Sequence, residues 1–329
     1  MNAARRELVR LCRGFGSDLL LVQGGGGNIS VKVSADELLI KASGLRLAEV
    51  NVRRGWARAD AALLRADLRR IVRLKTWAGR DRAYADLLTR AGRTPGWRVS
   101  MEAGFHALLP DRCVAHIHSL AGFLLGLLPE KEAGRRIRRA LGSEVDVYFV
   151  PACAPGADLT LRMRGRRAAA RPCVWMLKNH GVVWGAPSAA VVEKLSARFE
   201  RAFRKAYVLK RYAPPKIKRL GRGWHELSLR HWPDCSFDLR PLFPDFVVYF
   251  SLWGRGRKDL IKDSARSVRV YAKDDNNLRA KSETFFAHAL VSTVAPWLGL
   301  RLRRLSGPVV RAIAGLETER LRVKQAAAK

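Results

Sequence analysis

The chain has 329 residues, enough for one large domain or two, and 48% of them are hydrophobic, which suits a buried core. No apolar run reaches the length of a membrane-spanning helix, so we expect no membrane partner. Lysine and arginine total 62 against 29 acidic residues, a net charge of +33 that can indicate a polyanionic partner. No nucleic-acid-binding motif accompanies this charge, so we expect nucleic acid to bind only nonspecifically.

The beginning of the chain carries no signal-peptide core, which predicts a cytoplasmic protein. The five cysteines are scattered, odd in number and without C-x-x-C spacing, which argues against a disulfide framework. Residues 2–22 favour an amphipathic helix that leads into a strand. The four glycines from Gly24 to Gly27 come next. Such a run can form an anion-binding nest of backbone N–H groups or simply a flexible turn.

Two short strands are predicted next, over Val31–Val33 and Glu37–Lys41. Lys41 either adds charge to a pocket near the glycines or is a solvated strand residue. Residues 46–95 are rich in arginine and show leucines at helical spacing, so we expect one or two surface helices there.

The stretch from residue 100 to residue 120 concentrates Glu102 with His106, His116 and His118. Its spacing predicts a helix over 101–109 with Ser100 as N-cap, which would put Glu102 and His106 on one face. The apolar run 113–115 predicts a buried strand, after which His116 and His118 would share one face. Such a pair can hold two corners of a tetrahedral metal ion, or the two rings can be packed and hydrogen-bonded strand histidines.

Alternating helices and strands are expected over the middle of the chain. The predicted helices are Leu120–Leu128, Glu130–Leu141 and Pro187–Leu209, and the predicted strands are Val145–Pro151 and the segment that ends at Leu177. His180 follows the second of these strands. Two prolines within Tyr212–Lys218 indicate a boundary. We therefore divide the chain into residues 1–212, a basic linker over 213–235 and a C-terminal extension over 236–329.

The extension is expected to be ordered, with strands at Phe246–Phe250 and Val268–Tyr271 and helices at Lys281–Val294 and Leu305–Val323. Three further histidines, His225, His231 and His288, have no motif around them and are interpreted as structural.

Five blocks in this order resemble the class II aldolase and adducin head-domain family. They are Gly27-Asn28-Ile29-Ser30, Leu38 to Gly44, Ser100 to His106, Val114 to His118, and Asn179-His180-Gly181. The resemblance implies an α/β fold, a three-layer domain whose central, mostly antiparallel sheet is flanked by helices. A small C-terminal α+β extension is similar to the cap of larger bacterial sugar-aldolase-like members.

The resemblance also implies a site. His116, His118 and His180 would hold Zn²⁺ or another divalent metal, with Glu102 as the catalytic acid and base. The residues implied to bind substrate or phosphate are Gly27, Asn28, Ser43, Gly44 and Ser100. His106 would orient these groups or pack against them. The family usually has two adjacent serines before the glutamate, whereas this chain has Ser100-Met101, so a phosphorylated substrate is in doubt.

By the same resemblance the protein would be a zinc-dependent lyase, and a homotetramer. It would cleave or form a C–C bond in a ketose or ketose phosphate through a metal-stabilised ene-diolate. The same site can support epimerisation or dehydration. The alternatives are a non-catalytic, adducin-like binding module, in which eroded ligands are expected, and a nucleic-acid-associated protein that uses the basic surface.

Overall fold

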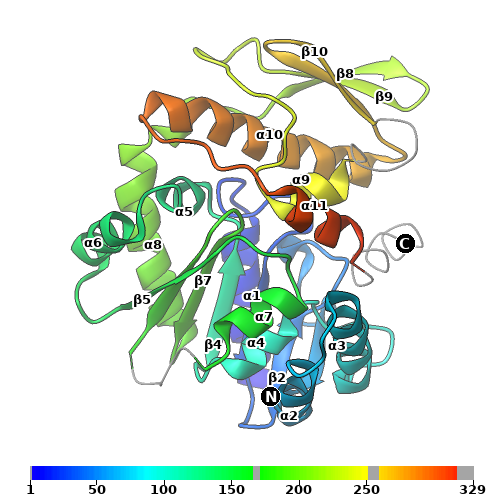
Figure 1. Ribbon diagram of the computed structural model, residues 1–329, viewed down its shortest axis with the longest axis vertical. Helices are drawn as coiled ribbons and strands as arrows, with labels where there is room; N and C mark the ends of the chain where they lie inside the picture. The colour runs from blue at the N-terminus through cyan, green and yellow to red at the C-terminus, as the bar shows by residue number, and fades with distance from the viewer. Residues whose placement is uncertain (1, 166–170, 251–258, 317–329) are drawn as a thin grey trace.

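A computed structural model describes residues 2–165, 171–250 and 259–316 (Figure 1). Its larger sheet has seven strands in the order β3-β2-β1-β4-β7-β6-β5. The strands are β1 (Asn28–Lys32), β2 (Glu37–Lys41), β3 (Trp56–Asp60), β4 (Cys113–Ile117), β5 (Asp146–Val150), β6 (Cys173–Leu177) and β7 (Gly181–Ala186). Only β5 and β6 pair in parallel, and the other neighbours are antiparallel. This confirms the predicted central, mostly antiparallel sheet.

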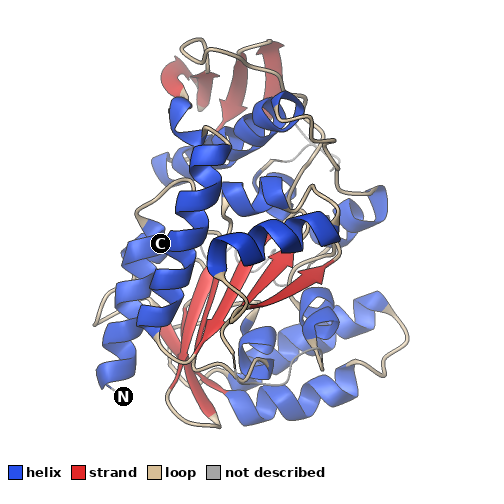
Figure 2. Ribbon diagram, turned by 90° about the vertical axis from the view of Figure 1, so that its left-hand side faces the viewer, coloured by secondary structure: helices blue, strands red, loops and turns tan. Residues whose placement is uncertain are grey.

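Helices cover both faces of this sheet (Figure 2). Side chains alternate along a strand, so each strand contributes to two different cores. In β4, Ala115 and Ile117 pack toward one face, with α1, α5, α6 and α8, whereas Val114 packs toward the other with α4 and α7. The helices of this part are α1 (Asn2–Gly16), α2 (Ala61–Ile71), α3 (Trp77–Ala91), α4 (Ala103–Leu108), α5 (Leu120–Leu125), α6 (Glu130–Leu141), α7 (Ala157–Met163) and α8 (Ala189–Ala206), with 3₁₀ turns at Leu47–Glu49 and Leu209–Arg211.

The C-terminal part adds a second, four-stranded sheet in the order β10-β11-β9-β8. Its elements are β8 (Lys216–Gly221), β9 (Trp224–Ser228), α9 (Pro244–Tyr249), β10 (Leu260–Ser264), β11 (Ser267–Tyr271), α10 (Asp275–Trp297) and α11 (Gly307–Ala314). In Figure 1, α10 lies beneath this small sheet, and α9 and α11 lie between α10 and the larger sheet. The predicted α+β extension is thus confirmed as a fold.

The predicted linker, residues 213–235, contains both β8 and β9 and is therefore not a simple connection. Strand β8 could not be predicted from apolar alternation, because it is an exposed, basic edge strand in which no apolar face is buried. The division of the chain into domains otherwise stays a prediction.

Three other local predictions were wrong. Residues 17–22 form turns instead of the predicted strand. Strand β3 was not predicted at all, because the small and charged residues of β3 carry a weak strand signal. Residues 246–250 were predicted as a strand, but most of them belong to helix α9. Pro244 occupies the first turn of α9, where a missing N–H costs nothing, and Asp245 lies near the positive end of the helix dipole.

The terminal helix is shorter than predicted among the described residues, and residues 317–323 of that prediction lie outside them. Across the described ranges, no helix combines the length and the apolar character needed to cross a bilayer. The cytoplasmic location stays a prediction.

His288 joins α10 to α9 inside the core. Its ring is fully buried and stacks on Phe246 with ring centroids 4.0 Å apart, and its Nε2 donates to the Asp238 carbonyl at 2.6 Å. Burial lowers the pKa of His288 from 6.5 to about 4, because a charged imidazolium is poorly solvated there. The structural role predicted for this histidine is consistent with these contacts.

We expect His288 to make the fold acid-sensitive. Between pH 6.5 and 4 the unfolded chain binds a proton at this residue and the folded chain does not, so stability is lost as pH falls. The loss from this residue is at most about 3 kcal/mol. Urea unfolding of metal-free protein at pH 7.5 and 5 measures it, with His288→Phe as the comparison. An equal pH dependence in both proteins contradicts this assignment.

Candidate metal centre

His116 comes from the last residues of β4, which lies between β1 and β7. The antiparallel register places Asn28 of β1 and Val183 of β7 opposite His116. The ring is fully buried, and its Nδ1 lies 3.0 Å from the Val182 carbonyl oxygen. A carbonyl can only accept, so Nδ1 carries the proton and Nε2 is left with a lone pair that faces the site.

His118 follows the same strand and shares the face of His116, as the H-x-H spacing predicts. Its Nδ1 lies 2.7 Å from the Oδ2 atom of Asp245, a residue of α9. Its Nε2 is 3.2 Å from the Nε2 of His116. That separation fits a hydrogen bond if one ring is protonated at Nε2. Because both Nδ1 atoms face acceptors, however, the arrangement favours two lone pairs, which a shared cation would hold together.

His180 lies in the turn between β6 and β7. Asn179, just before it, adopts the left-handed backbone conformation (φ 61°), and the Asn179 amide donates to the carbonyls of Leu242 and Arg303 at 2.8 and 2.7 Å. Gly181 passes so close to the backbone of Ile117 that a Cβ has no room there. The N-H-G motif therefore fixes the turn that aims His180 at the other two histidines.

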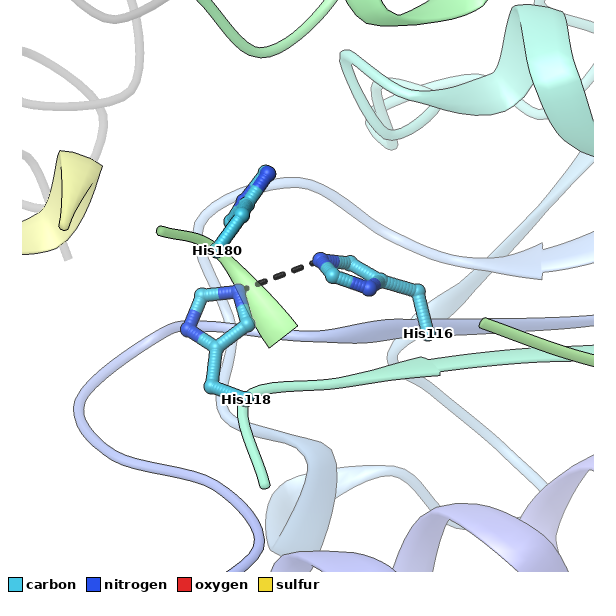
Figure 3. Close-up of side chains that lie close together, drawn as sticks. All are labelled: His116, His118 and His180. Carbon is cyan, nitrogen blue, oxygen red and sulfur yellow. Dashed lines mark hydrogen bonds between the residues drawn. The ribbon is translucent and has the colours of Figure 1, made fainter. Parts of the chain in front are cut away.

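The three histidines converge (Figure 3). Their potential ligand atoms all lie within 4.8 Å of one another, and the His180 ring centroid is 4.7 Å from that of His116 and 5.1 Å from that of His118. Two nitrogens bound tetrahedrally to one Zn²⁺ ion would be about 3.4 Å apart. The 3.2 Å between the Nε2 atoms of His116 and His118 is close to this value.

The electrostatics keep the rings of His116 and His180 neutral, as metal ligands must be. Burial, followed by the neighbouring histidines, holds the pKa of His116 well below 6.5. Burial and His118 lower the pKa of His180 to about 3, against an opposing effect of Asp245. Three imidazoles whose ring nitrogens converge in this way fit a divalent ion such as Zn²⁺.

Glu102 lies beside the histidines. Its carboxylate oxygens are 3.6 Å from His116 Nε2 and 3.7 Å from His180 Nε2. The predicted helical face shared with His106 was wrong, because α4 begins at Ala103 and Glu102 is its N-cap. Ser100, predicted to be that N-cap, instead accepts a hydrogen bond from the Glu102 backbone N–H at 3.3 Å.

Asn28 links Glu102 to His106. Its side-chain amide donates to Glu102 Oε2 at 2.6 Å, and its carbonyl oxygen contacts His106 Nε2. His106 Nδ1 lies 2.7 Å from the hydroxyl of Ser30. Because the Asn28 carbonyl accepts, His106 donates from Nε2 and accepts the Ser30 hydroxyl at Nδ1. This buried chain of hydrogen bonds orients the carboxylate and places His106 outside the histidine cluster.

A small cavity of about 40 Å³ opens beside this group. All five residues predicted to bind substrate line it, together with Glu102, His118 and His180. Lys41 is buried in its wall and donates to the Gly25 carbonyl at 3.2 Å, so it is not a solvated strand residue. Asp245 and Pro244 also line the cavity. The sequence analysis missed them, because their segment carries no motif that points to the site.

A larger groove, of about 510 Å³, lies between α6 and α8. Arginines line it, among them Arg136, which is paired with Glu132 at 2.5 Å. None of its lining residues is a histidine or a cysteine, so it offers no comparable set of metal ligands.

Comparisons with known proteins bear on these observations. A model of the class II aldolase and adducin N-terminal domain matches residues 6–207. The chain belongs to this family. The recognition made from the five motif blocks is thereby confirmed, and the match ends before β8. A search of curated proteins found no match.

Solved structures of this family are similar to the chain. The N-terminal class II aldolase domain of a conserved protein from Thermoplasma acidophilum is 25% identical, with a TM-score of 0.51 over 61% of this chain and 92% of that one. An aldolase II superfamily protein from Pseudomonas syringae is 16% identical (TM-score 0.45; 63% and 74% covered). An L-fuculose 1-phosphate aldolase is 20% identical (TM-score 0.42; 64% and 87% covered).

Replacing Asn28 tests the hydrogen-bond chain. Asn28→Ala removes two buried bonds and leaves polar groups of Glu102 and His106 without these partners, so we expect a loss of about 2–4 kcal/mol in unfolding free energy. Denaturant unfolding measures it. Ser34→Ala, in the exposed turn before β2, is the control and is expected to change stability by less than about 0.5 kcal/mol. An Asn28 variant as stable as this control contradicts the network.

Proposed function

We propose that the protein is a class II aldolase-like lyase that uses Zn²⁺ or another divalent metal. Its reaction is the cleavage or formation of a C–C bond in a ketose or ketose phosphate. The observation that carries the proposal is the convergence of His116, His118 and His180 and of Glu102 beside one cavity. Family membership supports it, since the same residues carry the family motifs.

In this proposal His116, His118 and His180 hold the metal through imidazole nitrogens. The bound metal supplies Lewis-acid polarisation of a substrate carbonyl. Glu102 is the general acid and base, which moves a proton to and from the substrate carbon next to that carbonyl. Asn28 keeps the carboxylate turned toward the histidines, since its amide donates to Oε2 at 2.6 Å. Loss of that bond would let the carboxylate rotate away from the reacting carbon.

The far end of the substrate would lie against Gly27, Ser43, Gly44 and Ser100, where Lys41 adds a positive charge to the wall. This charge favours a substrate with an anionic or strongly polar end. The homotetramer implied by the family resemblance and the cytoplasmic location predicted from the sequence stay predictions.

Metal content is the first test of this function. We expect about one Zn²⁺, Mn²⁺ or Co²⁺ ion per wild-type chain, and none in His116→Ala/His180→Ala, because two of three ligands are lost. Elemental analysis of the folded protein measures it. His231→Ala removes an exposed histidine of the C-terminal part and is the matched control. A folded wild-type protein that takes up no metal overturns the proposal.

Catalysis is the second test, made on the metal-loaded protein. Retro-aldol cleavage of a panel of ketoses and ketose phosphates is followed by the carbonyl products released. We expect Glu102→Gln to lower kcat by about 10²- to 10⁴-fold with metal still bound, since the amide cannot exchange the proton. Full activity in Glu102→Gln rules out this acid–base role.

A substitution at position 101 tests how the site recognises a substrate phosphate. Met101→Ser restores the second hydroxyl that this chain lacks. We expect it to lower KM for a phosphorylated ketose relative to its unphosphorylated counterpart by roughly 5- to 10-fold, the value of about one hydrogen bond. Met101→Ala, which removes the same side chain without adding a donor, is the control. An equal KM ratio in both variants removes position 101 from phosphate recognition.

A further inference from the structure

The C-terminal part of the chain reaches the metal centre. The family match ends at residue 207, yet Asp245, on α9, places its Oδ2 atom 2.7 Å from His118 Nδ1. Both side chains are largely buried, with exposed fractions of 8% for Asp245 and 11% for His118. The ring therefore donates from Nδ1 to a carboxylate that is shielded from water, and its Nε2 faces the other histidines.

Helix α9 is held in place from two sides. Phe246 stacks on His288 of α10, and Phe246 and Phe250 pack against each other in the core. On the other side, the Asn179 amide holds the carbonyl of Leu242, two residues before α9 begins. The turn that carries His180 is thus hydrogen-bonded to the segment that leads into the helix carrying Asp245.

The glycine-rich loop meets the same part of the chain at three successive residues. The Gly24 N–H donates to Glu283 at 2.7 Å, and the Gly25 N–H donates to the Tyr249 hydroxyl at 2.9 Å. At Gly26, a Cβ atom would lie 2.5 Å from His118 Nδ1 and 3.0 Å from Asp245 Oδ2. The absence of a side chain at Gly26 is what lets His118 and Asp245 meet.

We propose that Asp245 is a positioning residue of the metal centre, through which the C-terminal part sets the affinity for the metal. The inference rests on the proposed function, because it requires a metal at His116, His118 and His180. A carboxylate that accepts a hydrogen bond from Nδ1–H fixes the tautomer and ring orientation of a ligand histidine. It also makes the Nε2 of that histidine more basic and therefore a stronger metal ligand. His116 has a neutral carbonyl in this role, so Asp245 supplies a negative charge that Val182 does not.

The test compares two replacements of Asp245 in the full-length chain. Asp245→Asn keeps the shape and an acceptor oxygen but removes the charge, whereas Asp245→Ala removes the contact altogether. Asp263→Asn, on the small sheet in an exposed pair with Arg269, is the matched control. Zn²⁺ affinity is measured by competition with a chelator, Co²⁺ absorption reports the coordination, and circular dichroism of the metal-free proteins reports folding.

We expect Asp245→Ala to weaken Zn²⁺ binding by about 10- to 100-fold, Asp245→Asn by less, and Asp263→Asn not at all. Stoichiometry should stay at one ion, with an altered Co²⁺ spectrum in the Asp245 variants. If wild type and Asp245→Asn bind metal with equal affinity and identical spectra, the positioning role is wrong while the proposed function stands. If the folded wild type binds no metal, both the positioning role of Asp245 and the proposed function are wrong. Asp245→Asn is nearly isosteric, so it keeps the test valid even if Asp245→Ala does not fold.

Discussion

The register of β4 between β1 and β7 is the constraint on which the site depends. It sets His116 opposite Asn28 and brings the Val182 carbonyl oxygen to 3.0 Å from His116 Nδ1. Side chains alternate along a strand, so a slip of one residue would turn His116 into the apolar core that Ala115 and Ile117 share with α1 and α8. Burying an imidazole there without a partner is costly, and this cost helps to hold the register.

The second constraint is electrostatic. Three imidazoles and the Glu102 carboxylate lie within a few ångströms of one another and away from water. Burial removes the solvation that would let His116 and His180 become charged, so their lone pairs lie beside the Glu102 carboxylate without a compensating positive charge of their own. A divalent cation at this point would offset the charge and the repulsion, so metal binding and folding stability should be linked. The Asn28 network then acts on the orientation of Glu102, and Asp245 adds both orientation and a negative charge beside His118.

Local patterns in the sequence predicted those features of the site that depend on the geometry of a single strand or turn. The alternation of a strand was enough to place His116 and His118 on one face, whereas His180 was singled out only through the family resemblance, in which Asn-His-Gly is one of five motif blocks. The position of Glu102 was harder to predict from the sequence. Ser100 was expected to be the N-cap, but α4 begins at Ala103, so Glu102 precedes the helix and does not share a helical face with His106. Strand β8 was missed because an exposed edge strand lacks the apolar alternation by which strands are recognised.

The role of Asp245 could not be predicted from the sequence, for a different reason. Its contact with His118 joins segments more than a hundred residues apart, and nothing near Asp245 has the spacing of a site. The residues directly after it, Phe246–Phe250, were also predicted to form a strand, which would have sent alternate side chains to opposite faces. Helix α9 instead puts Asp245 and Tyr249 one turn apart, so both face the glycine loop.

The same contacts argue against an independent N-terminal unit. Phe123 of α5 packs edge-on against Phe243 with ring centroids 5.7 Å apart, and one continuous core contains side chains from both α5 and α10. Without residues 242–316, that apolar surface and the N–H groups of Gly24 and Gly25 would face water. The histidine cluster would also lose the carboxylate beside His118. The boundary of the family match is therefore not a boundary of the core, and the C-terminal part is structurally a wall of the candidate site.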